Sequence, residues 1–430
     1  MTIGDPGHRA DKTSADTKRA DTTGAPAGAG SSGRTQLVRW AISSATLGFP
    51  QAAGPVAFAL LAVSLGGEAS SGAAMILAMT LAQVAGALPL TRLGRPFAPA
   101  SFLKLLLAVR TAALVGIAAG AACGASLPWL IALAAAAGLV NGAAFGYLRA
   151  VLNRLAPASG MSRALGIAAT LNELTFVLAP VVASGLGSVS PVLGIVAMAA
   201  VGAFPAFLIP NLGPAAPPEG IGGGIDGGLP RERTSILSPP ILLWLACTAA
   251  GGATVASIEI GAVALALGFG YEPALAILFT VPLCLAAVTG GIWVSVRNRR
   301  PTRRVVVAQL LVMCAGSALA AAGLSMAATL AGAVLIGLVL APLATHYSLI
   351  LDTLAPPHRR PEVFALMRTA NACGVILASA LLTAVSLSTA MLAITSVMMA
   401  ATVAVGVAGV RGRDRAAAKL GDGTGSAGGA

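Results

Sequence analysis

The chain has 430 residues, of which 57% are hydrophobic and only 10% are charged. Because a soluble domain needs about a quarter of its residues charged to cover its surface, this composition excludes an ordinary soluble protein and indicates a polytopic membrane protein. The net charge of +12 comes from short basic clusters between long apolar runs, a pattern typical of topology signals and not of a nucleic-acid-binding face.

Taken in chain order, the sequence predicts six membrane spans, a linker and six further spans. Residues 1–35 are polar and lack the apolar core of a signal peptide, so we expect a disordered cytoplasmic tail. Apolar runs of about 20 residues or more, which cross a bilayer as helices, follow at 37–64, 71–91, 101–123, 127–150, 163–187 and 191–211. They form an N-terminal bundle over 36–211.

The Gly- and Pro-rich segment 212–239 predicts a cytoplasmic linker, because it cannot build a core. A C-terminal bundle over 240–410 comes next, before a second disordered tail at 411–430. Its predicted spans are 240–267, 273–296, 304–325, 327–350, 363–385 and 389–410.

The positions of Lys and Arg predict the orientation in the membrane. They lie in the tails, in even-numbered connections or inside a helix, whereas odd-numbered connections such as "GGEAS" and "GFGYEP" contain none. By the positive-inside rule, we expect a multi-pass protein of the plasma (cytoplasmic) membrane with both termini cytoplasmic.

The two halves repeat in sequence. "VLNRLAP" (151–157) aligns with "ILDTLAP" (350–356) at an offset of 199 residues, which also pairs Gly138 with Gly337 and Asn172 with Asn371. Chance explains Ala and Leu matches in such a chain, but Pro and Asn matches at one offset favour duplication. Parallel six-helix repeats are a known transporter architecture. We therefore expect an all-α membrane fold of twelve transmembrane helices in two bundles, related by a pseudo-two-fold axis along the membrane normal.

This layout, together with two motifs, resembles the major facilitator superfamily of secondary transporters over about residues 36–410. "ALPLTRLGRP" (87–96) is similar to the family's Gly-x-x-x-Asp-Arg-x-Gly-Arg signature: Arg92, Gly94 and Arg95 match, while Ala87 and Thr91 replace the Gly and the Asp. "FVLAP" (176–180) is similar to the Gly-Pro pair of the antiporter motif, and the fifth span is most like that of poorly characterised bacterial members.

The resemblance implies the two-bundle fold, alternating access, and a charge-pairing or gating role for Arg92 and Arg95. The family's fourth-span motif, built around an Arg near the outer side, is absent. Arg149 stands at the cytoplasmic end of that span instead.

No catalytic, metal-binding or nucleotide-binding pattern is present, so we expect neither an enzyme nor a metal or cofactor. Function must then come from polar groups inside the spans. Glu173 and Glu259 are the two carboxylates well within predicted helices, and Arg110 is the clearly internal basic residue. Because an ionised group at the bilayer centre costs about 2.5–3.5 kcal/mol, all three should face the bundle interior.

Both carboxylates are proton-coupling candidates. Glu173 lies ten residues beyond Arg163, roughly 15 Å deep and near the midplane. Low-dielectric surroundings disfavour its charged form, so it can bind and release a proton. An equally weighted alternative is a structural carboxylate, paired with Arg110 or hydrogen-bonded to Asn172. Glu259 is near the outer end of the seventh span, which the resemblance places beside the central cavity; there it attracts a cation or transfers protons, or it simply reaches outer water.

Arg110 lies six residues beyond Lys104, about 9 Å in, where snorkelling or pairing is favoured over substrate binding. Other polar residues on these helices are candidates for the substrate cavity. For Asn172 and Asn371, which match at the repeat offset, interhelical hydrogen bonding is favoured over contact with a substrate. For His346, simple solvation is favoured over a role as a proton site. The candidates are Gln51, Asn141, Asn172, His346 and Asn371.

So few polar groups suit a small amphipathic or hydrophobic molecule better than a sugar. The sequence therefore favours a monomeric secondary active transporter in the lipid bilayer that uses the proton gradient to export such a molecule by alternating access. One alternative is a facilitator or importer of a small metabolite. Another is a non-transporting accessory membrane protein with the same fold.

Overall fold

The computed structural model describes residues 28–66, 69–157, 159–209, 236–272, 275, 277–299 and 301–424. In this part of the chain, twelve helices are long and apolar enough to cross a membrane. They confirm the twelve predicted spans. The fourth is divided at Val140 into two helices, α4 and α5.

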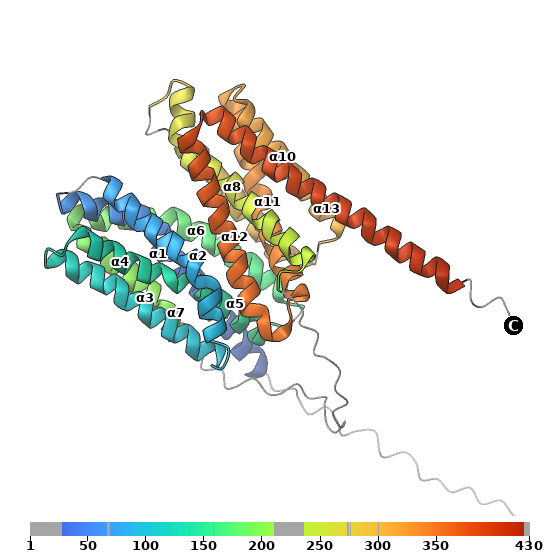
Figure 1. Ribbon diagram of the computed structural model, residues 1–430, viewed down its shortest axis with the longest axis horizontal. Helices are drawn as coiled ribbons and strands as arrows, with labels where there is room; N and C mark the ends of the chain where they lie inside the picture. Colours follow the sequence, from blue (N-terminus) through green and yellow to red (C-terminus); the bar gives the residue numbers. More distant parts are fainter. Residues whose placement is uncertain are drawn as a thin grey trace, which may run out of the picture.

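The N-terminal bundle contains seven labelled helices, shown in blue to green in Figure 1. They are α1 (Gly28–Ser64), α2 (Ala69–Leu93), α3 (Pro99–Ala122), α4 (Leu127–Leu139), α5 (Asn141–Leu155), α6 (Met161–Val189) and α7 (Pro191–Leu208). The C-terminal bundle contains α8 (Pro239–Gly268), α9 (Ile277–Arg297), α10 (Arg303–Ala322), α11 (Met326–Leu354), the 3₁₀ turn η2 (Pro357–Arg359), α12 (Arg360–Ala384) and α13 (Leu387–Thr424).

The ends of the chain differ in part from the expected tails. The first helix begins at Gly28, within the segment 1–35 for which we expected disorder, and α13 continues through 411–424 to Thr424. The apolar span ends close to the predicted 410, but the extension "RDRAAAKL" consists mostly of strong helix formers, so the helix continues beyond it. Residues 1–27, most of the expected linker 212–239, and 425–430 lie outside the described residues.

Each bundle is held together by close helix packing at glycine. A Cβ atom on Gly138 would lie 1.9 Å from the carbonyl oxygen of Met79 on α2, and one on Gly337 would lie 2.3 Å from the carbonyl oxygen of Leu283 on α9. Only glycine permits so close an approach of two helix backbones in a membrane. The two glycines matched in sequence thus make the same contact in each half, as two related bundles require.

Each bundle also buries its own apolar core. Phe58, Leu114 and Ile117 are fully buried in one, and Phe279 and Leu310 in the other. The outward faces carry large exposed apolar side chains, which suit contact with lipid tails.

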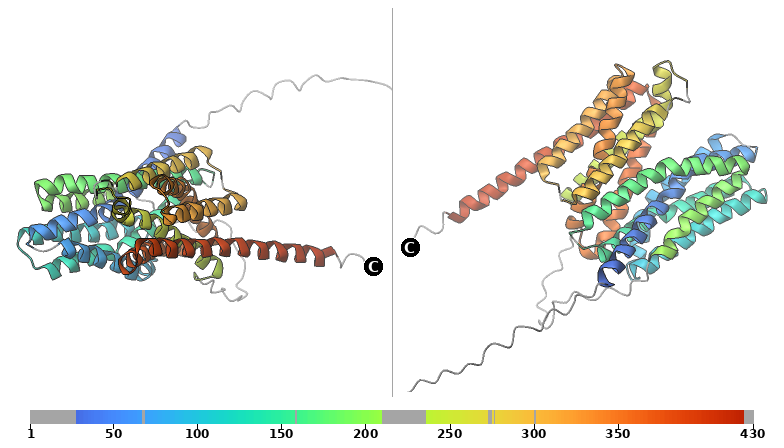
Figure 2. Two further views of the ribbon diagram at one scale, coloured as in Figure 1. Left: turned by 90° about the horizontal axis from the view of Figure 1, so that it is seen from above. Right: turned by 180° about the vertical axis from the view of Figure 1, so that it is seen from behind.

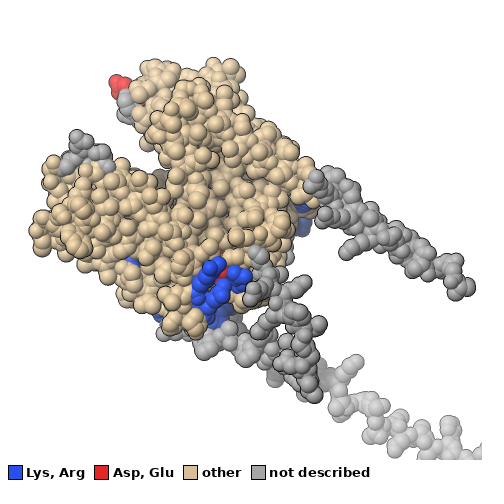
Figure 3. All heavy atoms as spheres, in the orientation of Figure 1, with Lys and Arg blue, Asp and Glu red and all other residues tan. Residues whose placement is uncertain are grey.

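The two bundles meet at one end and diverge toward the other (Figures 1 and 2). We call the joined end the basic end, because Arg92, Arg95, Arg163, Arg359 and Arg360 lie there. Across it, α6 packs on α9, and α12 packs on α2 and α5. In Figure 3, basic side chains gather at this end, and the surface is hollowed between the two halves at the opposite end.

Candidate functional site

A cavity of about 350 Å³ lies between the two bundles. This volume falls in the range of small-molecule sites. Its wall is largely apolar, with aromatic side chains from both halves, and carries a small set of polar residues. The polar or aromatic lining residues are Trp40, Ser44, Phe145, Arg149, Asn172, Glu173, Phe176, Thr248, Glu259, Thr345, Tyr347, Ser348, Phe364, Arg368 and Asn371.

The two carboxylates singled out in the sequence face this cavity from different bundles. Glu173 projects from α6 and is half-buried, whereas Glu259 projects from α8 and is exposed toward the cavity. Among the described residues, neither carboxylate forms an ion pair with a basic side chain. Both are therefore open to a proton or a cationic group that enters the cavity.

Asn172 and Asn371 occupy matching places in three dimensions as well as in sequence. Both line the cavity. A Cβ atom on Gly48 of α1 would lie 3.4 Å from Asn172 Oδ1, and one on Gly252 of α8 would lie 2.7 Å from Asn371 Oδ1. Each Asn thus packs against a glycine on the first helix of its own bundle, with its side chain at the cavity wall.

Arg110 neither snorkels to the surface nor pairs with Glu173. Its side chain on α3 is 2% exposed, and it donates hydrogen bonds to the carbonyl oxygens of Leu47 (2.9 Å) and Gly202 (2.5 Å) and to Asn141 Oδ1 (3.3 Å). These acceptors belong to α1, α7 and α5. Arg110 is therefore a cross-link inside the N-terminal bundle.

Three expected cavity residues do not line the cavity. Asn141 is 2% exposed and donates from Nδ2 to Gln51 Oε1 (2.9 Å) and Gln83 Oε1 (2.7 Å), within the packed bundle. His346 on α11 lies edge-on to the Trp244 ring of α8, with ring centroids 5.0 Å apart. The prediction failed for these residues because it could not tell how each helix is rotated about its own axis. A helix that is apolar on all sides gives no sequence signal for the face that meets the cavity.

Two cavity arginines were not foreseen as such. Arg368 on α12 donates to Gln51 Oε1 (2.6 Å) across the bundle interface, and Arg149 on α5 donates to Ser348 Oγ (3.0 Å) and Asn153 Oδ1 (2.6 Å). Each lies close to a charged loop in sequence, so the sequence alone predicts a residue at the membrane–water interface. The signal that marks them is a phenylalanine four residues earlier, in "FGYLR" (145–149) and "FALMR" (364–368).

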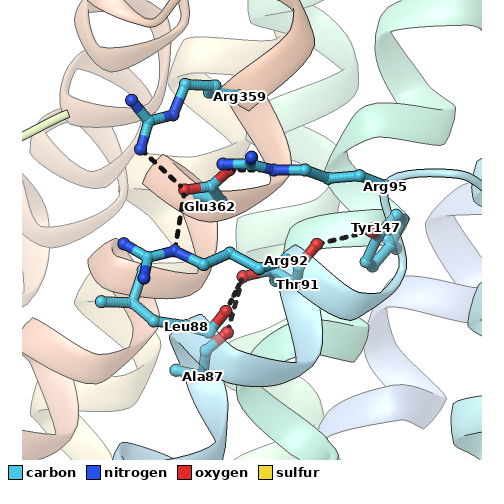
Figure 4. A network of polar contacts seen from close by, with 8 residues as sticks. All are labelled: Ala87, Leu88, Thr91, Arg92, Arg95, Tyr147, Arg359 and Glu362. Carbon is cyan, nitrogen blue, oxygen red and sulfur yellow. Dashed lines mark hydrogen bonds and ion pairs between the residues drawn. The ribbon is translucent and has the colours of Figure 1, made fainter. Parts of the chain in front are cut away.

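The basic end is closed by polar contacts between the bundles (Figure 4). Glu362 on α12 is 1% exposed and is surrounded by Arg95, by Arg92 (3.8 Å) and by Arg359 (3.2 Å). Arg92 and Arg95 come from the signature-like segment at the end of α2 and in the turn after it, so the structure brings both gating candidates to one carboxylate. Thr91, in the place of the family's Asp, bonds its hydroxyl within α2 to the carbonyl oxygen of Ala87.

Two further contacts at this end join residues that are 199 positions apart. Arg149 Nε donates to Ser348 Oγ, and Asn153 Nδ2 donates to Asp352 Oδ1 at 2.5 Å. That separation equals the offset of the sequence repeat. A residue touches its own counterpart only where both lie beside the symmetry axis, so the pseudo-two-fold axis passes between α5 and α11 here.

Two six-helix bundles around a central cavity, closed at one end, define a polytopic transporter. The chain matches the family model "Major Facilitator Superfamily" over residues 40–379, and it belongs to this family. It is thus a multi-pass membrane protein, and the family points to a transporter of small molecules in a lipid bilayer rather than an enzyme. No sequence among the curated proteins matches it.

Solved structures share the fold at low identity. A bacterial homologue of the iron transporter ferroportin, in its outward-facing state, matches with TM-score 0.70 and 15% identity, covering 88% of this chain and 98% of the other. The human organic anion transporter MFSD10 (TETRAN) matches with TM-score 0.62 and 13% identity over 87% and 98%. The transporter FucP in the outward conformation matches with TM-score 0.61 and 14% identity, covering 86% of this chain and 99% of the other. In the described part of this chain, no cluster of three or more His, Cys, Asp or Glu residues is suited to a metal ion.

Proposed function

We propose that this protein is a secondary active transporter that exports a small amphipathic or hydrophobic molecule in exchange for protons, by alternating access. The observation that carries the proposal is the position of Glu173 and Glu259. Both face one cavity, from opposite bundles, and among the described residues neither is neutralised by an ion pair. Carboxylates placed this way take up a proton when the substrate leaves.

The lining of the cavity supports the substrate class. Aromatic residues from both bundles, including Trp40, Phe176 and Phe364, offer flat apolar surface, and a small number of polar groups can orient a bound molecule.

The basic end supports an orientation with that end in the cytoplasm, by the positive-inside rule. In this orientation both termini are cytoplasmic, the cavity opens outward, and the protein acts as a monomer in the plasma membrane. Opening of the basic end then exposes the same cavity to the cytoplasm, where an exported molecule binds.

Transport into proteoliposomes under an imposed pH gradient tests the proposal. We expect Glu173→Gln and Glu259→Gln each to abolish proton-driven accumulation of a fluorescent amphipathic dye, because an amide cannot exchange a proton. Glu272→Gln, on the exposed loop after α8, is the matched control and should transport as the wild type does. Full coupled transport by both cavity variants would refute the proton-exchange mechanism.

A further inference from the structure

The floor of the cavity is formed by two Phe–Arg pairs that pack against each other across the bundles. The Arg149 guanidinium lies over the Phe364 ring, 4.8 Å from its centroid, and the Arg368 guanidinium lies over the Phe145 ring at 4.4 Å. In each helix the Phe precedes the Arg by four residues, one helical turn, so the arrangement is reciprocal between α5 and α12. All four side chains line the cavity.

Among the described residues, neither arginine forms an ion pair with a carboxylate. Arg149 is 6% exposed, and its hydrogen bonds go to Ser348, Asn153 and the sulfur of Met161. The carboxylate of Asp352, on the facing helix, accepts from Asn153 and contacts Arg360.

Arg368 donates to the neutral amide of Gln51. In the part of the chain that the structure describes, the Arg149 Nη2 and Arg368 Nε atoms are buried without a hydrogen-bond partner. Two desolvated guanidinium groups with unused N–H donors, one from each bundle, form a site for an anion.

The same cavity therefore carries charge of both signs at different depths. By the sequence repeat, Arg368 corresponds to Ala169, and Glu173 lies four residues farther along α6. Counterparts related by an axis along the membrane normal lie at the same depth, so Glu173 is roughly 6 Å farther from the basic end than Arg368. With all four side chains ionised, two glutamates and two arginines sum to zero.

We propose that the transported molecule is a small aromatic or amphipathic zwitterion. Its anionic group binds Arg149 and Arg368 on the cavity floor, its cationic group binds Glu173 and Glu259 above, and its apolar body lies along the aromatic wall. A zwitterion is neutral overall and satisfies both sets of charges, whereas a simple cation or anion leaves one set unmatched. Departure of the cationic group frees the two carboxylates for protons, which links this substrate class to exchange.

The inference rests on the proposed function only in using this cavity as the substrate site. Binding is measured without a pH gradient, so a failure of proton coupling leaves this test unaffected, and the reverse also holds.

The test is calorimetric titration of the full-length protein in lipid nanodiscs with matched probes. Two aromatic frames are used, each as zwitterion, cation and anion: phenylalanine, phenylethylamine and 3-phenylpropionate; tryptophan, tryptamine and indole-3-propionate. We expect the zwitterion to bind most tightly on at least one frame. Arg368→Gln should weaken the zwitterion and the anion about 10- to 100-fold and leave the cation within about twofold. Glu173→Gln should weaken the zwitterion and the cation and spare the anion.

Retained binding of the spared probe shows that each variant is folded. Arg149→Gln repeats the test on the other bundle, Arg368→Lys should recover part of the anion affinity, and Arg299→Gln, exposed at the basic end, should behave as wild type. The proposal is overturned if the cation binds as tightly as the zwitterion and ignores the arginine variants, if the anion binds best, or if none of the six probes binds.

Discussion

Arg110 shows how a guanidinium is accommodated inside the N-terminal bundle without a carboxylate. Its terminal nitrogens Nη1 and Nη2 donate to carbonyl oxygens of α1 and α7 and to Asn141 Oδ1 on α5, so three neighbouring helices share one cation. Burial of a charge is costly unless hydrogen bonds replace its hydration. Here these bonds make Arg110 a structural residue, and among the described residues it forms no ion pair with a carboxylate, which leaves Glu173 available.

Replacement of this side chain should therefore act on stability. We expect Arg110→Met to lower the free energy of unfolding by about 2 kcal/mol, because Asn141 and two carbonyl groups lose a charged donor that nothing replaces. Thermal unfolding of the purified protein measures the change. Arg110→Lys keeps the charge but loses the planar set of guanidinium N–H donors, so its free energy of unfolding should lie between those of the wild type and the Met variant. A Met variant as stable as the wild type would contradict the cross-linking role.

At the scale of helices, the contact between the second and fourth spans of each bundle depends on glycine. Gly138 meets the backbone of α2, and Gly337 meets the backbone of α9, at distances that leave no room for a methyl group. Because the obstructing atoms are backbone carbonyl oxygens, a side-chain rotation cannot relieve the clash.

We expect Gly138→Ala and Gly337→Ala each to destabilise the protein by a similar amount, about 1–3 kcal/mol, since the two contacts are counterparts. Gly185→Ala on α6 is the control: a Cβ there meets nothing within 4 Å, so its effect should be neutral or slightly stabilising. Thermal unfolding midpoints give the comparison. A harmless change at either packed glycine would argue against equivalent packing in the two bundles.

At the scale of the whole molecule, Glu362 joins the two bundles at the basic end through ion pairs. One buried carboxylate offsets three arginines: one at the end of α2, one in the turn that follows α2, and one beside α12. Without its charge, the arginines repel one another at the junction of the two bundles, which favours separation of the bundles at this end.

We expect Glu362→Gln to shift the population toward a state open at the basic end. Distances between spin labels on the ends of α2 and α12 would then lengthen, and a cysteine placed on the cavity floor would become reactive from that side. Asp352→Asn, which removes the carboxylate that contacts Arg360, should shift the population less. An unchanged distance distribution in the Glu362 variant would exclude this carboxylate as the closing element.

The fold could be predicted from the sequence because each of its signals is local. Apolar runs define the spans, the placement of arginine defines one common end, and matched residues such as Gly138 and Gly337 reveal the repeat. Glu173 and Glu259 stood out because carboxylates are rare in such runs. That both line one cavity could not be predicted from such local signals, because the cavity depends on how the two bundles pack against each other.

Other site residues were missed for the same reason. Arg368 and Glu362 are close in sequence to a charged loop, where exposure is the ordinary outcome; their contacts with Gln51 and with Arg92 and Arg95 span more than 250 positions of the chain. Conversely, Gln51 and Asn141 look like cavity residues but serve interhelical bonding. Polarity in a membrane helix indicates burial within protein, but not whether the partner is a ligand or a neighbouring helix.

The contacts between counterparts near the axis have an evolutionary consequence. In an assembly of two identical six-helix chains, residue 149 would face its own copy, so an arginine there would confront a second arginine, and residue 153 would likewise meet its twin. Fusion into a single gene removes that constraint, because the two positions can then mutate independently. Arg149 with Ser348, and Asn153 with Asp352, are unequal partners that a symmetric ancestor had no means to encode.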